Sequence, residues 1–434
     1  MDLTSRRIAE PARFTIRTDR RLVRADGGSE RFVLAELVAP VPRRDQDRRR
    51  PAVSLAFVVD RSGSMAGRGK LDLAKRGVLE ALERLEPTDR FSVVAYDDQV
   101  DVVVASVHAT PEARHTAADA LRDVEPRGST NLADGWLRGA EQVAGQLAES
   151  GVNRVLLLTD GLANVGVTDP TALAHHAAEL RARGVATSTI GVGADFDETL
   201  LQALADAGGG HFYFAGSLPE IRDHLTSEVG EALEVVARDV TLNVTTAPSV
   251  EVRTLTPHAA DSLGERTIVR IGDLVAGQLA RVVLRIRFPS GAEGTELGVL
   301  LAATDADGVM ATATHATLSL AWRFASHDAN DRQPRDRVVD RVVADLFAAR
   351  ARQEAVALNR TGEHEQARRA LESVARRILG YSAGDDALGA LAAELQAQAP
   401  QMAAPMPELR RKAMHFASAN VSRGRDPQGR SRRA

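Results

Sequence analysis

Residues 53–65 read VSLAFVVDRSGSM, an apolar run that ends abruptly in polar residues. The apolar part is nearly continuous instead of alternating, which is typical of a parallel strand covered by helices on both faces. Asp60, Ser62 and Ser64 follow at once. In an extended segment, side chains two residues apart point to the same side, so we expect these three oxygen side chains to converge. They stand at the carboxyl end of a buried strand, which is the edge where open α/β sheets bind their ligands.

Two later segments supply oxygen side chains at corresponding places. Thr130 lies in the stretch RGSTNL (127–132), just before an amphipathic run, and Asp160 follows the apolar strand 155–158. All of these candidate ligands are hard oxygens, which suit Mg²⁺, Mn²⁺ or Ca²⁺ and not a soft metal. Hydroxyl ligands are neutral, so an ion held by them keeps most of its charge and can accept a carboxylate from another molecule. The pattern therefore predicts a metal site for binding and not for catalysis.

In these segments the sequence resembles the von Willebrand factor type A (VWA) domain and its metal-ion-dependent adhesion site, the MIDAS. DRSGS (60–64) matches the Asp-x-Ser-x-Ser pattern of that family, GST (128–130) supplies its threonine, and TDG (159–161) supplies its second aspartate. The resemblance implies that the two aspartates act partly through bound water. It also implies a site for Mg²⁺, or for Mn²⁺ or Ca²⁺, formed by Asp60, Ser62, Ser64, Thr130 and Asp160.

The periodicity of the chain predicts where this domain begins and ends. We expect a Rossmann-like, doubly wound α/β domain at residues 51–237, where apolar strands alternate with helical stripes. From residue 238 the apolar period changes from 3.6 to 2, which indicates antiparallel strands to about residue 325. The strands expected within residues 1–50 are too few to fold alone. We therefore expect them to complete a β-sandwich with residues 238–325, into which the VWA domain is inserted.

Sandwich-flanked VWA domains of this kind occur in relatives of the inter-alpha-trypsin inhibitor heavy chains, so the resemblance extends to this architecture, by analogy. Beyond the sandwich, two helical stretches within residues 335–397 predict a helical hairpin that packs on it. Residues 398–434 contain Pro and Met and then become basic, and we expect a disordered tail there. The charged stretch 43–50 is expected to be a solvated linker.

Composition narrows the class of protein. The net charge of −4 over 434 residues gives no reason to expect a nucleic-acid partner. There is no cysteine, so disulfides and thiolate metal sites are excluded. The first twenty residues lack the apolar core of a signal peptide, and no later stretch approaches the ~18–20 apolar residues of a membrane span. We expect a cytoplasmic protein without a membrane partner. Only three of its basic residues are lysines, which we interpret as a bacterial coding bias.

These observations predict a protein-interaction module that binds an Asp or Glu of a protein partner through a divalent cation. One alternative is an accessory subunit of an AAA+ ATPase, which must be another chain, because no Gly-x-x-x-x-Gly-Lys-[Ser/Thr] segment occurs here. Another is a metal-free structural scaffold. We do not expect an enzyme, because Ser62 and Ser64 lie in no Gly-x-Ser-x-Gly elbow and no histidine is an evident base for them.

Overall fold

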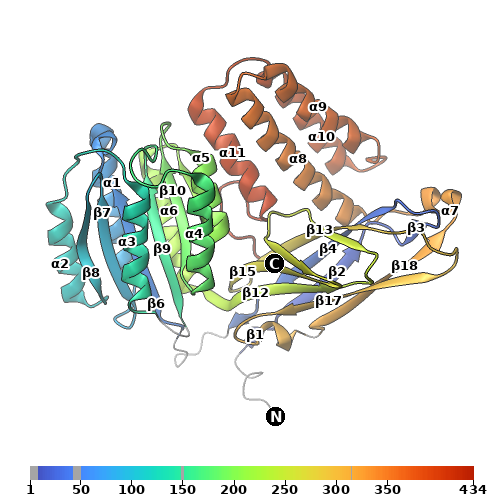
Figure 1. Cartoon of the computed structure of the whole chain (residues 1–434), viewed down its shortest axis with the longest axis horizontal. Helices are drawn as coiled ribbons and strands as arrows, with labels where there is room; N and C mark the ends of the chain where they lie inside the picture. Colours follow the sequence, from blue (N-terminus) through green and yellow to red (C-terminus); the bar gives the residue numbers. More distant parts are fainter. Residues whose placement is uncertain (1–7, 43–49, 148–150, 314) are drawn as a thin grey trace, which may run out of the picture. The chain divides into compact units, whose positions relative to one another are not determined.

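A computed structural model describes residues 8–42, 50–147, 151–313 and 315–434 (Figure 1). Contacts divide the chain into two compact units. One is Asp47–Val235, and the other joins Met1–Gln46 to Val236–Ala434. The first unit thus interrupts the second in the sequence. Apart from Arg50, the linker expected at residues 43–50 lies outside the described residues.

The unit Asp47–Val235 is built on a six-stranded sheet with the strand order β11-β10-β9-β6-β7-β8. All neighbouring strands are parallel except β7 and β8. Every residue of β6 and of β9 is buried, which explains why each strand contains a run of apolar residues, 55–59 in β6 and 155–158 in β9. The order of connection reverses between β6 and β9, and such a switch point opens a crevice at the carboxyl ends of the strands. The strands are β6 (Val53–Asp60), β7 (Arg90–Tyr96), β8 (Val100–His108), β9 (Val152–Thr159), β10 (Ala186–Val192) and β11 (Gly209–Ala215).

Helices cover both faces of this sheet, as predicted for a doubly wound fold (Figure 1). Close packing requires glycine at one contact, because a Cβ on Gly139 of α3 would lie 2.2 Å from Val58 Cγ2. The sequence did not predict α2, which buries only Ala117 and Leu121 and so lacks a strong apolar stripe. The helices are α1 (Lys70–Leu82), α2 (Pro111–Arg122), α3 (Leu132–Ala144), α4 (Pro170–Ala182), α5 (Glu198–Gly208) and α6 (Leu218–Leu233), and the 3₁₀ helix η2 spans Gly63–Gly69.

The second unit contains a β-sandwich whose two sheets share one apolar core. The N-terminal strands take part in it, because β4 pairs with both β2 and β16. One sheet has the order β14-β15-β12-β17-β18-β3 and the other β13-β16-β4-β2. The strands are β2 (Arg13–Thr18), β3 (Leu22–Arg24), β4 (Glu30–Val38), β12 (Val235–Thr245), β13 (Glu251–Thr254), β14 (Ala260–Leu263), β15 (Arg266–Val275), β16 (Leu279–Arg287), β17 (Glu296–Thr304) and β18 (Thr317–Ala325), with a separate pair β1 (Ile8–Glu10) and β5 (Val41–Pro42) and the 3₁₀ helix η3 (Met310–Thr312).

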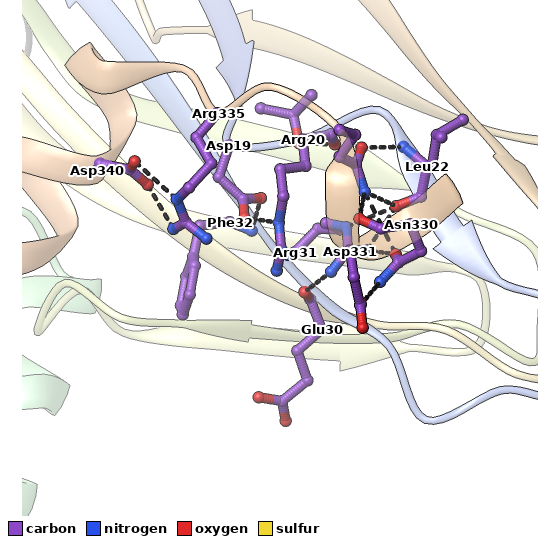
Figure 2. Close-up of polar contacts among 12 residues, drawn as sticks. Asp19, Arg20, Leu22, Glu30, Arg31, Phe32, Asn330, Asp331, Arg335 and Asp340 are labelled. Carbon is purple, nitrogen blue, oxygen red and sulfur yellow. Dashed lines mark hydrogen bonds and ion pairs between the residues drawn. The ribbon is translucent and has the colours of Figure 1, made fainter. Parts of the chain in front are cut away.

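Buried polar contacts hold the segment that leaves the sandwich (Figure 2). The guanidinium of Arg31 on β4 donates to the carbonyl oxygen of Leu22 (Nε···O 2.9 Å) and to the side chain of Asn330 on α7 (His327–Arg332). Burial lowers the pKa of Arg31 to about 10. Nearby, the Asp19 carboxylate accepts a hydrogen bond from the Phe32 backbone N–H (2.8 Å). These contacts fix α7 to the first strands of the chain.

The C-terminal part of this unit is more helical than the sequence predicted. A two-helix hairpin at 335–397 is wrong, because Asp385 caps a third helix by accepting from the Leu388 backbone N–H (3.2 Å). Val339 and Val343 of α8 pack on Leu34 and Val283 of the four-stranded sheet. The helices are α8 (Arg337–Arg360), α9 (His364–Leu379), α10 (Asp386–Gln398) and α11 (Glu408–Ser422), with η4 at Ala399–Ala403.

The disordered tail expected at 398–434 is also wrong. Met402 and Met406 lie in the core of the helices, and Met414 of α11 packs against that core. After α11 the chain returns to the start of β16, where the Leu279 N–H donates to the Arg432 carbonyl oxygen (2.8 Å). The basic composition of this segment predicted disorder, although α11 packs on the other helices through a few apolar residues. None of the helices in the described ranges is long and apolar enough to cross a membrane.

Candidate metal centre

Asp60 ends β6 with its carboxylate fully buried. Its Oδ1 accepts from the backbone N–H of Ser62 (2.8 Å), and its Oδ2 accepts from the hydroxyl of Thr159 at the end of β9 (2.6 Å). These two bonds orient the carboxylate across the switch point between β6 and β9. Thr159 was not among the predicted site residues, although it precedes the predicted Asp160.

The two serines of the loop after β6 lie together, as their spacing predicted. Ser62 Oγ is 3.1 Å from Ser64 Oγ, and the Ser64 hydroxyl donates to Asp160 Oδ1 (2.5 Å). Between them, the Gly63 N–H donates to the carbonyl oxygen of Gly128 (3.2 Å). That bond joins the loop to the segment that carries Thr130.

Thr130 enters the same group through its backbone. Its N–H donates to Asn164 Oδ1 (3.0 Å), and its carbonyl oxygen accepts from the Asn164 N–H (3.2 Å). A Cβ on Gly161 would lie 3.4 Å from Thr130 Oγ1 and 3.6 Å from Ser64 Oγ. Glycine at position 161 therefore leaves open the space beside both hydroxyls. The structure brings all five predicted residues to one edge of the sheet.

The electrostatics of this edge fit a bound cation. Burial raises the pKa of Asp60 to about 6, the hydrogen bonds from Thr159 and Ser62 partly offset this, and the charge of Asp160 raises it further. Tyr96 is the partner of Asp60 in the β6–β7 register, and its hydroxyl is buried. Burial, and then the charge of Asp60, raise the pKa of Tyr96. Buried carboxylates and hydroxyls of this kind suit a hard divalent ion.

Lys70 places a positive charge against this group, and the sequence analysis did not single it out. Lys70 Nζ lies 2.5 Å from Asp160 Oδ2. The arginines nearby have other partners, since Arg127 Nε donates to Asp97 Oδ2 (2.5 Å) and Arg61 pairs with Asp101. The signal for Lys70 was its rarity, because the whole chain contains three lysines.

A family model of the von Willebrand factor type A domain matches residues 54–228, from the second residue of β6 into α6. The chain contains a VWA domain. Such domains are protein-interaction modules, often metal-dependent, and commonly carry a MIDAS. The resemblance inferred from DRSGS, GST and TDG is confirmed.

Curated relatives of this chain include bacterial and animal proteins. It is 30% identical over 242 residues to the uncharacterized protein YfbK of Escherichia coli, an alignment that covers 56% of this chain and 41% of that protein. It is 37% identical over 123 residues to human inter-alpha-trypsin inhibitor heavy chain H3, which covers 27% of this chain and 14% of that one. The chain thus spans less than half the length of these relatives.

Two solved structures share the fold over most of this chain. One is a von Willebrand factor type A protein from Catenulispora acidiphila, with a TM-score of 0.67, 19% identity, and coverage of 88% of this chain and 89% of that one. The other is the ArnB paralog VWA2 from Sulfolobus acidocaldarius, with a TM-score of 0.61, 15% identity, and coverage of 95% and 99%. Both confirm the doubly wound fold class.

Proposed function

We propose that this VWA domain binds a protein partner through a divalent cation, with Mg²⁺ as the expected ion. Asp60, Ser62, Ser64, Thr130 and Asp160 hold the ion, and an Asp or Glu of the partner completes its coordination. The observation that supports this most is the meeting of oxygen side chains from three loops, in which Ser64 Oγ lies 3.1 Å from Ser62 Oγ and 2.5 Å from Asp160 Oδ1.

The donor set favours binding of an outside carboxylate. Three of the five side chains are neutral hydroxyls. Both carboxylates already accept hydrogen bonds, Asp60 from Thr159 and Asp160 from Ser64 and Lys70. Their charge is therefore shared, and a bound ion would supply an electrophile that attracts a further acid.

The same contacts argue against a serine nucleophile. Ser62 and Ser64 contact each other, and Ser64 donates to a carboxylate that also pairs with Lys70. A nucleophilic serine is commonly activated by a histidine, and within the described residues neither hydroxyl makes a hydrogen bond to one. We therefore interpret both hydroxyls as ligands.

Metal uptake tests the first half of the proposal. We expect wild-type protein to bind Mn²⁺ at one site and Mg²⁺ to compete for it, measured by water-proton relaxation enhancement and calorimetry. Thr130→Ala should weaken binding by about ten-fold or more, because one oxygen ligand is lost. The control Thr168→Ala, an exposed threonine in the loop after Asp160, should bind like wild type. No uptake by the wild type would leave the metal-free scaffold as the remaining interpretation.

Carboxylate binding tests the second half. Acetate is the probe, and it should displace water from protein-bound Mn²⁺ and lower the relaxation enhancement. Formamide, which is neutral and of similar size, should not. An enhancement that acetate leaves unchanged would contradict carboxylate binding at the ion. Partners can then be sought by crosslinking in Mg²⁺ or in EDTA with Thr130→Ala as control, and recovery of an ATPase would identify the AAA+ alternative.

A further inference from the structure

We infer that Lys70 competes with the divalent cation for Asp160 and so sets the metal affinity of the site. This inference rests on the proposed function and adds to it a residue that tunes the site. Its starting point is the ion pair between Lys70 Nζ and Asp160 Oδ2 (2.5 Å), on a carboxylate whose other oxygen accepts from Ser64. Asp160 is fully buried, and 17% of the Lys70 side chain is exposed.

The ion pair with Asp160 explains why a lysine stands at position 70, because the position of this residue in its helix does not favour a positive charge. Lys70 is the first residue of α1, where the helix dipole disfavours a positive charge. The chain enters α1 through Gly69, whose φ of 72° turns it from η2 into the helix. Lys70 Nζ also lies 3.9 Å from the position that a Cβ on Gly193 would occupy. The side chain thus extends from α1 toward the carboxyl ends of β9 and β10.

An ammonium group at this position works against a metal ion. An ion bound to Asp160 and to Ser64 would stand within a few ångströms of Lys70 Nζ, and like charges at such separations repel strongly where little water screens them. The partly exposed Lys70 side chain can move out to solvent, whereas Asp160, which is fully buried and directly follows β9, cannot. Metal binding therefore releases Lys70 from Asp160, and metal loss restores the ion pair.

The chain offers a matched control on the same helix. Lys75 of α1 donates to the Val124 carbonyl oxygen (2.8 Å) and lies 3.7 Å from Asp72, so it has the same charge but different partners. Substitution of either lysine by methionine keeps the length of the side chain and removes its charge. Lys70→Arg keeps the charge and serves as the conservative variant.

Calorimetric titration with MgCl2 and MnCl2 measures the competition. We expect Lys70→Met to bind both ions about ten-fold more tightly than wild type, since a nearby positive charge is lost. Lys75→Met and Lys70→Arg should remain near the wild-type affinity. In an Asp160→Asn background, Lys70→Met should change the affinity much less. Equal affinities of wild type and Lys70→Met would overturn the inference while leaving the proposed function intact, whereas no uptake by either would refute the proposed function.

Release of Lys70 has a second readout that uses the unmodified chain. Brief acetylation with N-hydroxysuccinimidyl acetate, followed by mass spectrometry, reports the reactivity of each lysine. Saturating Mg²⁺ should raise the labelling of Lys70 at least two-fold, while Lys75 and the buried Lys412 serve as internal references. If saturating Mg²⁺ leaves the labelling of Lys70 unchanged, metal binding does not release Lys70 from Asp160 and the inference is overturned.

Discussion

Hydrogen bonds to Asp60 favour the ionised carboxylate, whereas its burial opposes ionisation. Thr159 and Ser62 donate to its two oxygens, yet the carboxylate is fully buried and its pKa rises to about 6. A buried carboxylate without a cation destabilises the fold, and a cation at the same place removes that cost. The Asp60 carboxylate should thus destabilise the fold without metal and stabilise it when metal is bound.

We predict that Asp60→Asn raises the free energy of unfolding in EDTA at pH 7 by roughly 1–3 kcal/mol, because the amide is neutral and keeps both hydrogen-bonding neighbours. With Mg²⁺ at one hundred times its Kd, wild type should gain about 2.7 kcal/mol and the variant nothing. Urea unfolding in the two buffers measures both. Asp98→Asn, at an exposed aspartate, is the control and should change neither value by more than about 0.5 kcal/mol. A variant that is less stable in EDTA would contradict this account of burial.

At this scale the sequence predicted the five candidate ligands, because Asp-x-Ser-x-Ser, the threonine and the second aspartate each follow a recognisable pattern. It did not predict Lys70, which meets Asp160 over a sequence separation of 90 residues. Nor did it predict Asn164, which holds the Thr130 backbone. Such contacts depend on where separate loops cross, and no local pattern in the sequence records that.

Helix α6 is joined to the sheet by one buried carboxylate. Glu228 accepts from Arg154 Nη1 of β9 (2.5 Å), from the Ser188 hydroxyl of β10 (2.5 Å) and from the Tyr213 hydroxyl of β11 (2.6 Å). His211 Nδ1 lies 3.1 Å from its second oxygen. Although burial opposes ionisation, the charges of His211 and then Arg154 hold the pKa of Glu228 well below its ordinary value of 4.5.

We predict that Glu228→Gln lowers the free energy of unfolding at pH 7 by about 3–5 kcal/mol, as expected when one partner of a buried ion pair is removed. Asp223→Asn, at an exposed position of the same helix, is the matched control and should cost less than about 0.5 kcal/mol. The measurement is urea unfolding followed by circular dichroism. An equal effect of both substitutions would refute the role of Glu228 as an anchor.

The same carboxylate predicts a pH dependence. Because the pKa of Glu228 is lower in the folded than in the unfolded chain, its contribution is complete above about pH 4.5 and is lost as the pH falls below that value. Wild type should therefore lose stability more steeply than Glu228→Gln between about pH 4.5 and 3.

Among the elements, the strands of the unit Asp47–Val235 were predicted best. The strands β6 and β9 are buried along their whole length and leave an unmistakable apolar run. Helix α2 has two buried residues and helix α10 has three, so the apolar stripe that predicts a helix is weak in both. Their caps, Thr110 and Asp385, are visible in the sequence but were not recognised as starts.

At the scale of the whole molecule, the C-terminal quarter is the largest revision. The sequence suggested two helices and a free tail, whereas the second unit continues through α11 to a bond between Ala434 N–H and the Gly277 carbonyl oxygen (3.1 Å). Helix α11 has few apolar residues that pack on the rest of its unit, and charged residues stand among them in the sequence. Composition alone therefore favoured disorder.

We predict that trypsin cleaves the native chain slowly at Arg410, Arg411 and Lys412, because α11 is packed on α8 and helical backbone does not fit a protease cleft. Mass spectrometry of brief digests measures this. In urea the same three sites should be cut at once, which provides the positive control. Rapid loss of the C-terminal peptide from the native protein would show that the segment is free.

Pairing of β4 with β16 has a consequence for how the chain is made. Glu36 and Arg281, which pair across these strands at 2.9 Å, are 245 residues apart. During synthesis, the first strands leave the ribosome long before their partner exists, and the inserted unit is complete in the meantime. Closing so long a span is slow. The early strands must be shielded from other chains throughout that interval, which makes translation speed and chaperone supply determinants of the yield of folded protein.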